Sequence, residues 1–137
     1  AAKGHLPERD GIYIGLLIIE MMVRSGKSLS ELVAGLFEKY GPHYYHRNDL
    51  LTDDDKKNAM IAYCKAKKLT DILGSAVVKW DFKDGIKHHL EDGSWVLVRP
   101  SGTEPVLRIY AESNDSGKVQ ELVEEVAALV DMPVIFE

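Results

Sequence analysis

The order of sequence patterns in the second half of the chain is the feature that most restricts its fold. Short runs rich in β-branched and apolar residues follow one another from residue 76 to residue 111, and a helical pattern lies on each side of them. Such runs, separated by turn residues, are typical of antiparallel strands. The pattern predicts an α+β fold, a two-layer sandwich of an antiparallel sheet and helices. The expected strands are residues 76–81, 86–90, 94–99 and 106–111.

The flanking helices are predicted over residues 53–69 and 117–130. The first begins at three consecutive carboxylates, Asp53, Asp54 and Asp55, which complement the positive end of a helix dipole. We interpret them as a helix start rather than a metal site, because a hard cation needs further oxygen ligands from elsewhere. In the second helix, apolar residues at three- and four-residue spacing form one stripe, namely Val119, Leu122, Val123, Val126, Leu129 and Val130.

Two helices of a different character are predicted near the N-terminus. Residues 12–23 form an apolar run that is too short to span a bilayer, which needs about 20 residues, so a core helix is expected. Ser28 and Glu31 have capping-box spacing and start a second helix, which ends at residues 40–42. The predicted division is therefore helices of a preceding domain in 1–42, a polar linker in 43–52, and a C-terminal domain in 53–137.

Composition narrows the choice of partners. The net charge of −5 argues against nucleic acid, whose binding proteins usually carry a basic patch, and no membrane partner is expected. The single cysteine, Cys64, cannot form an internal disulfide and fits a reducing compartment, so a cytoplasmic location is predicted. We interpret Cys64 as a small buried side chain, and His88 and His89 as structural or surface residues, because neighbouring strand residues point to opposite faces.

The chemistry of the chain is concentrated in one loop and the strands beside it. Arg99 and Arg108 flank a turn that contains Ser101, Gly102 and Thr103. Two guanidinium groups, two hydroxyls and an unobstructed backbone are the composition of a phosphate-binding loop. The alternative is that both arginines are ordinary exposed strand residues joined by a turn rich in Ser, Gly and Pro.

Two segments resemble a known family. The run from Arg99 to Glu112 closely resembles the C-terminal signature of the α-D-phosphohexomutases, the phosphoglucomutase/phosphomannomutase family. Residues 4–11 resemble the segment that follows the sugar-binding loop in the third domain of that family. The resemblance implies a C-terminal fragment of a four-domain enzyme that moves a phosphoryl group between the 1- and 6-positions of a hexose. It also implies a C-terminal domain that resembles the TATA-binding-protein fold.

The resemblance implies roles for particular residues. The residues expected to bind the substrate phosphate are Arg99, Ser101, Gly102, Thr103 and Arg108. Arg9 matches a basic residue that lines the active site in relatives, and His5 is a candidate for lining the substrate.

The family's catalytic serine loop and its Asp-x-Asp-x-Asp magnesium loop have no match in the sequence, so this fragment is expected to be inactive alone and to hold no metal. Mg²⁺ and a sugar 1,6-bisphosphate would serve the full-length enzyme. The expected partners are a phosphorylated hexose and the protein's own N-terminal domains. The alternative function is a free-standing phosphate-binding or regulatory module without catalysis.

Overall fold

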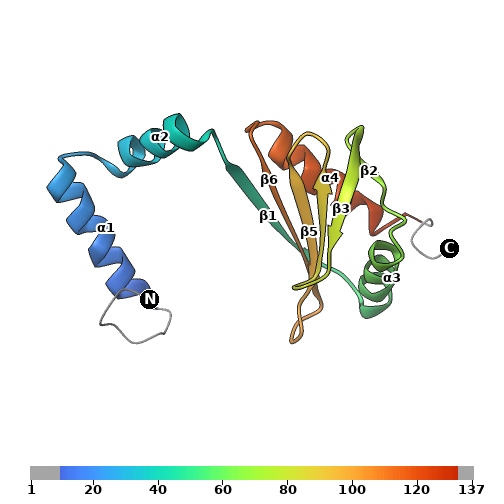
Figure 1. The fold of residues 1–137 in the computed structure, drawn as a ribbon. Helices are drawn as coiled ribbons and strands as arrows, with labels where there is room; N and C mark the ends of the chain where they lie inside the picture. The colour runs from blue at the N-terminus through green and yellow to red at the C-terminus, as the bar shows by residue number, and fades with distance from the viewer. Residues whose placement is uncertain (1–9, 133–137) are drawn as a thin grey trace. The chain divides into compact units, whose positions relative to one another are not determined.

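The computed structural model describes residues 10–132, which fall into two compact units with a boundary between Gly41 and Pro42 (Figure 1). The first unit contains two helices, α1 (Gly11–Ser25) and α2 (Leu29–Tyr40). The capping box predicted at the start of α2 is present, because the Ser28 side chain accepts from the Glu31 backbone while the Glu31 carboxylate accepts from the Ser28 backbone.

Within the described residues, the first helix lacks the cover that its apolar residues call for. It was predicted as a core helix, yet no residue of α1 is buried, and Ile12 and Val23 are 82% and 76% exposed. A helix that is apolar on most sides needs cover on most sides. The described part of the first unit supplies only α2, whose residues are also not buried.

The second unit is a six-stranded antiparallel sheet in the order β1-β6-β5-β4-β3-β2, with helices α3 (Asp54–Lys65) and α4 (Lys118–Leu129). This confirms the predicted α+β class. The strands are β1 (Tyr44–Leu51), β2 (Asp71–Ile72), β3 (Ser75–Asp81), β4 (Ile86–Leu90), β5 (Trp95–Pro100) and β6 (Val106–Ser113).

Residues 43–52, predicted as a polar linker with a short strand as an open alternative, contain a full edge strand. β1 pairs with β6 along its whole length, from Tyr44 opposite Ser113 to Leu51 opposite Val106. Tyr44 and Leu50 are partly buried against the core, which anchors a strand whose other residues are mostly polar. The second compact unit accordingly begins at Pro42, before β1.

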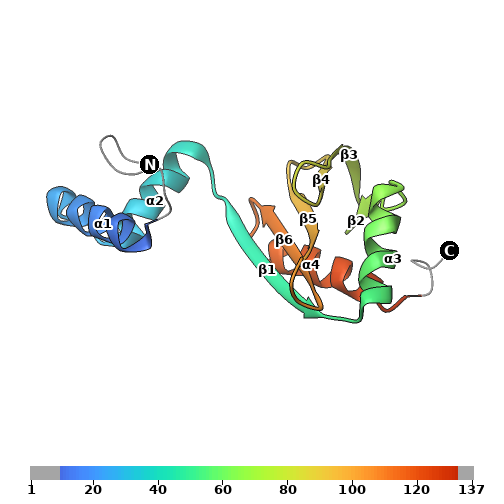
Figure 2. The same ribbon diagram turned by 90° about the horizontal axis from the view of Figure 1, so that it is seen from below.

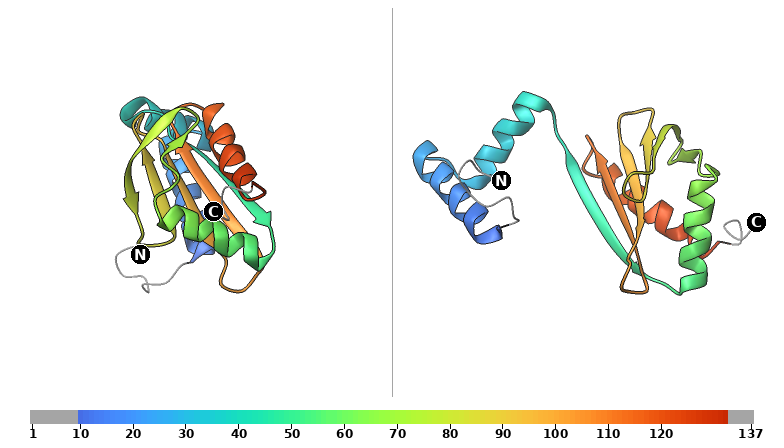
Figure 3. Two further views of the ribbon diagram at one scale, coloured as in Figure 1. Left: turned by 90° about the vertical axis from the view of Figure 1, so that its right-hand side faces the viewer. Right: turned by 60° about the horizontal axis from the view of Figure 1, so that its bottom comes forward.

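One core lies between the sheet and its helices. α4 contacts β6 and β1, and α3 contacts β5 and β4 (Figures 2 and 3). The predicted stripe of α4 supplies buried Val119, Leu122, Val123 and Val126. Cys64 of α3 is fully buried, as predicted, and its burial raises the pKa of the thiol to about 12. At neutral pH it is therefore a protonated packing residue.

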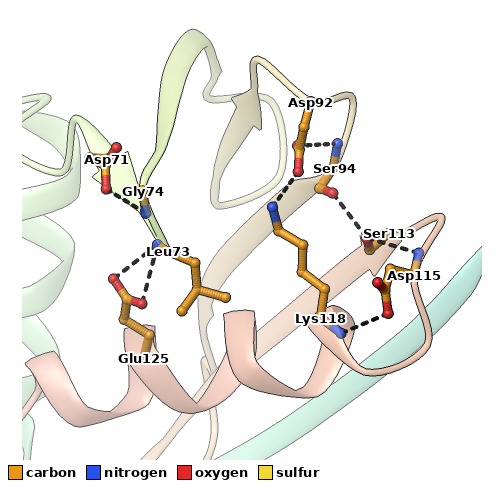
Figure 4. A network of polar contacts seen from close by, with 9 residues as sticks. All are labelled: Asp71, Leu73, Gly74, Asp92, Ser94, Ser113, Asp115, Lys118 and Glu125. Carbon is orange, nitrogen blue, oxygen red and sulfur yellow. Dashed lines mark hydrogen bonds and ion pairs between the residues drawn. The ribbon is translucent and has the colours of Figure 1, made fainter.

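The start of α4 is attached to the strand ends by a polar network (Figure 4). Lys118 pairs with Asp92, and the other Asp92 oxygen accepts from the Ser94 backbone at 2.9 Å. The Ser94 hydroxyl in turn lies 3.1 Å from the Ser113 hydroxyl, to which the Asp115 backbone donates at 3.2 Å. The β4–β5 turn, the end of β6 and the first turn of α4 are thereby joined.

Gly85 and Gly93 provide a matched test of close packing at the ends of β4. Both have φ of +87°, but a Cβ atom at Gly85 would lie 2.7 Å from the Val98 carbonyl oxygen, whereas at Gly93 none of the described residues comes within 4 Å. Both alanine variants carry the same backbone strain, so only Gly85→Ala adds a clash. We expect Gly85→Ala to lower the free energy of unfolding by about 1–3 kcal/mol more than Gly93→Ala, measured by urea denaturation. Equal losses would contradict the close approach.

Candidate functional site

The two arginines predicted to bind phosphate lie directly opposite each other. Arg99 near the end of β5 and Arg108 near the start of β6 are register partners. Their strand neighbours Val98, Leu107 and Ile109 are fully buried in the core, so alternation places both arginines on the opposite face of the sheet. Side chains directly opposite in an antiparallel pair have Cβ atoms about 5 Å apart. The two arginine side chains therefore start from adjacent positions on one face of the sheet.

Carboxylates offset this pair of like charges. Arg99 Nε lies 3.2 Å from Asp84 Oδ1, and an Arg108 Nη atom lies 3.2 Å from Glu104 Oε2. Asp49 of β1, the register partner of Arg108, places an oxygen 4.0 Å from the Arg108 Nε. Hydrogen bonding to Arg47 is the main reason that the pKa of Asp49 is lowered, and the charge of Arg108 adds to it. Asp49 is thus a permanent anion beside the arginine pair.

Arg108 is the more enclosed of the two arginines. Its side chain is 26% exposed, against 43% for Arg99. Its Nε atom is buried and makes no hydrogen bond within residues 10–132. An N–H in that state gains from any additional acceptor, and an anionic acceptor would be the strongest.

The loop between the strands is short and internally bonded. The Ser101 backbone donates to the Val106 carbonyl at 2.9 Å, and the Val106 backbone donates to the Glu104 carbonyl at 2.7 Å. Ser101 is buried, while Gly102 and Thr103 are exposed. Gly102 has no positive φ, and no described atom lies within 4 Å of where its Cβ would be. A glycine at this position therefore relieves no clash with the described chain, and its effect is to keep the loop surface open.

A hollow of about 430 Å³ is formed on the loop. Residues Ser101 to Pro105 provide one wall, and Asp54 and Lys57 of α3 provide another. Arg99 and Arg108 lie at the base of the loop, outside this lining. The structure therefore brings together Ser101, Gly102 and Thr103 around the hollow, with the arginine pair at the root of the same hairpin.

Lys57 lines the hollow although the sequence did not single it out, and Asp54, which the sequence indicated only as part of a helix start, lines it too. The carboxylate run was correctly interpreted as a helix start, with Asp53 as N-cap accepting from the Lys56 backbone at 2.8 Å. What the sequence does not show is the pairing of β1 with β6, which brings Leu51 beside Val106 and so carries the start of α3 to the loop. His5 and Arg9 lie outside the described residues.

Residues 10–132 contain neither a cluster of metal ligands nor a membrane-spanning helix. Over this range no three His, Cys, Asp or Glu side chains are gathered as a metal ion would require. The described helices include none with the length and apolar character needed to cross a membrane.

Comparisons with known proteins agree with the signature residues. Residues 51–129 match the family model described as phosphoglucomutase/phosphomannomutase, C-terminal domain, and residues 1–40 match that of the alpha/beta/alpha domain III. The first match alone covers more than half of the chain. The chain belongs to the phosphoglucomutase/phosphomannomutase family.

Individual relatives lead to the same family. A phosphoglucomutase/phosphomannomutase of Thermococcus kodakarensis is 35% identical over 116 residues, which are 85% of this chain and 23% of the relative. A phosphoglucosamine mutase of Methanocaldococcus jannaschii is 34% identical over 124 residues, 88% of this chain and 25% of the relative. This chain thus spans about a quarter of the length of these curated relatives.

Solved structures share the fold. A protein of Thermus thermophilus assigned as a phosphomannomutase superposes with a TM-score of 0.67 at 32% identity, covering 93% of this chain and 24% of that one. Parafusin, a phosphoglucomutase of Paramecium solved in its open form, gives 0.66 at 23% identity, over 91% of this chain and 28% of that one.

Proposed function

We propose that this chain is the part of a phosphohexomutase that binds the phosphate group of a phosphorylated hexose. The ligand groups are Arg99, Ser101, Gly102, Thr103 and Arg108. The observation that carries the proposal is the register of β5 and β6, which sets Arg99 and Arg108 opposite each other at the base of a hollowed loop. Two planar guanidinium groups at that spacing can donate to different oxygens of one phosphate.

The carboxylates around the arginines support a site that exchanges anions. Asp84 and Glu104 are exposed, so their ion pairs with the arginines are weak in water and easily replaced. A phosphate dianion offers more acceptor oxygens and more charge than either carboxylate. These carboxylates can hold the arginines in place until a phosphate arrives.

In the whole protein, the proposed activity is interconversion of hexose 1-phosphate and hexose 6-phosphate. Phosphoryl transfer depends mainly on alignment and electrostatics, so binding one phosphate of the sugar fixes the reacting hydroxyl at the other end. Mg²⁺ and a sugar 1,6-bisphosphate would act with the rest of the protein, because the described residues do not form a donor set for a metal. We expect this chain alone to bind sugar phosphate and to convert none.

The proposal is tested by titrating glucose 6-phosphate or glucosamine 6-phosphate into the isotope-labelled chain and following backbone amide shifts. We expect the largest shifts at Ser101, Gly102 and Thr103, competition by inorganic phosphate, no effect of unphosphorylated glucose, and weaker binding at higher salt. Shifts that avoid this loop would show that it is a turn and not a binding site.

A further inference from the structure

The two ends of the Arg108 guanidinium have different surroundings. Its Nε is buried, lies 4.0 Å from the Asp49 Oδ2 of β1, and makes no hydrogen bond within residues 10–132. One of its terminal Nη atoms lies 3.2 Å from the carboxylate of Glu104, whose side chain is 59% exposed. A ligand that arrives from solvent therefore meets the terminal nitrogens, and Nε is left for a partner from the protein itself.

Asp49 is held in a fixed position beside the buried Nε. It is the register partner of Arg108, so the two side chains leave the sheet on the same face. Arg47, two residues earlier, donates from Nε to Asp49 Oδ1 at 2.6 Å and from Nη to Asp49 Oδ2 at 2.5 Å. The Arg47 guanidinium in turn lies 5.4 Å from the ring centre of its own register partner, Tyr110. These contacts orient the carboxylate, whose two oxygens have lone pairs left for a further donor.

We propose that Asp49 is a positioning residue for phosphate binding: it accepts from Arg108 Nε and so directs the terminal nitrogens of Arg108 towards the ligand. This inference rests on the proposed function. The 4.0 Å between Asp49 Oδ2 and Arg108 Nε is longer than a hydrogen bond, and a shift of about 1 Å closes it. When phosphate replaces the Glu104 carboxylate at the terminal nitrogens, the Arg108 side chain is free to make that shift.

Removal of the Asp49 charge distinguishes positioning from simple electrostatics. Asp49 is an anion near the expected position of another anion, so on charge alone Asp49→Asn would strengthen binding. Loss of positioning instead weakens the binding of inorganic phosphate, by about three- to tenfold, because the single carbonyl oxygen of asparagine cannot serve both arginines as an ionised carboxylate does.

Glu112→Gln is the matched control for net charge. Glu112 lies on the same face of β6 as Arg108, and its carboxylate pairs with His43 Nδ1 at 3.0 Å. The substitution removes the same charge from the same face and is expected to leave the affinity within about twofold of the parent.

A positioning residue acts through its partner, so the effect of Asp49→Asn must depend on Arg108. Lysine at position 108 keeps the positive charge but has no separate Nε–H for Asp49 to hold. In an Arg108→Lys background, Asp49→Asn is therefore expected to leave the affinity unchanged or to raise it, by about twofold at most. The Arg108 Nε–H signal in NMR reports the contact directly. It is expected to move downfield as phosphate is added to the parent, and to lose this response in Asp49→Asn.

The experiment is a titration of the full 137-residue chain with inorganic phosphate, followed by amide and arginine Nε–H shifts, with thermal unfolding of each variant as a check on folding. If Asp49→Asn binds phosphate as tightly as the parent or more tightly, the proposal is overturned. An equal loss in Glu112→Gln, or a loss of the same size in the Arg108→Lys background, also overturns it. Should Asp49→Asn fail to fold, the Arg108 Nε–H signal of the parent decides: a downfield shift supports the proposal, and no shift overturns it.

Failure of this inference can be told apart from failure of the proposed function. If Arg108→Ala abolishes binding while Asp49→Asn retains the parent affinity, the loop is a phosphate site and Asp49 has no part in it. If the unaltered chain does not bind phosphate, both the function and this inference are overturned.

Discussion

Arg99→Ala is expected to weaken the binding of glucose 6-phosphate about ten- to a hundredfold, because charge-assisted hydrogen bonds contribute about 1.5–3 kcal/mol each. Arg108→Ala is expected to have an effect of the same order. Arg108 is the more enclosed of the two, and its buried Nε lacks a hydrogen bond within the described residues. Binding constants from amide shifts or calorimetry measure both effects.

Arg99→Lys separates geometry from charge at this position. Lysine keeps the positive charge but loses the planar pair of donors, so we expect it to restore only part of the lost affinity. Arg24→Ala is the control, since Arg24 also forms an exposed ion pair, with Glu20 at 3.0 Å, but lies in α1. Full recovery in Arg99→Lys would indicate a simple attraction between charges. An equal loss in Arg24→Ala would indicate a general effect of net charge.

Acidification is expected to destabilise the fold through His88. This side chain is fully buried, and neither ring nitrogen meets hydrogen-bond criteria with a partner in residues 10–132. Burial lowers its pKa from 6.5 to about 4, although nearby backbone groups of Val96 and Ile86 raise the pKa in part. The folded state thus binds fewer protons than the unfolded state between these pH values. The free energy of unfolding therefore has its full value with respect to His88 above about pH 6.5. As the pH falls towards 4, protonation of His88 in the unfolded state lowers it by up to about 3 kcal/mol.

The contribution of His88 is measured by comparing the free energy of unfolding of the parent protein and of a His88 variant at several pH values. His88→Leu removes the titrating group, so its free energy of unfolding should fall less steeply between pH 6.5 and 4 than that of the parent. Direct titration of the His88 ring by NMR gives a second measurement. A pKa above 6 in the folded protein would contradict the explanation.

The elements with strong periodicity could be predicted from the sequence. The helix predicted over residues 117–130 agrees with α4 to within a residue at each end, and five of the six residues of its stripe are buried as the spacing requires. The hairpin of β5 and β6 was also predictable, since turn residues interrupt two β-branched runs. The composition of the loop between them was enough to suggest a phosphate-binding site. The register of the two strands adds that Arg99 and Arg108 lie opposite each other.

What could not be predicted depends on contacts between distant segments. In β1 only Tyr44 and Leu50 pack against the core, so the strand lacks the apolar alternation by which half-buried strands are recognised. Without that strand, nothing in the sequence indicates that the first turn of α3 lies near the loop between β5 and β6, because the pairing of β1 with β6 brings the two segments together. The long apolar run of α1 shows a different limit: its composition indicates burial, but burial needs neighbours that the described unit does not contain.

The polar composition of β1 also has a consequence for association between molecules. β1 ends the sheet, so the backbone groups along its outer side are not paired within the sheet and could join the edge strand of another molecule. Arg47 and Asp49 form an ion pair on this strand, and the exposed His46 lies between Tyr45 and Arg47. Strand addition here would remove these charged groups from water, which opposes fibril-like growth along this edge. The polar residues that make β1 difficult to predict from the sequence therefore also oppose aggregation through this edge of the sheet.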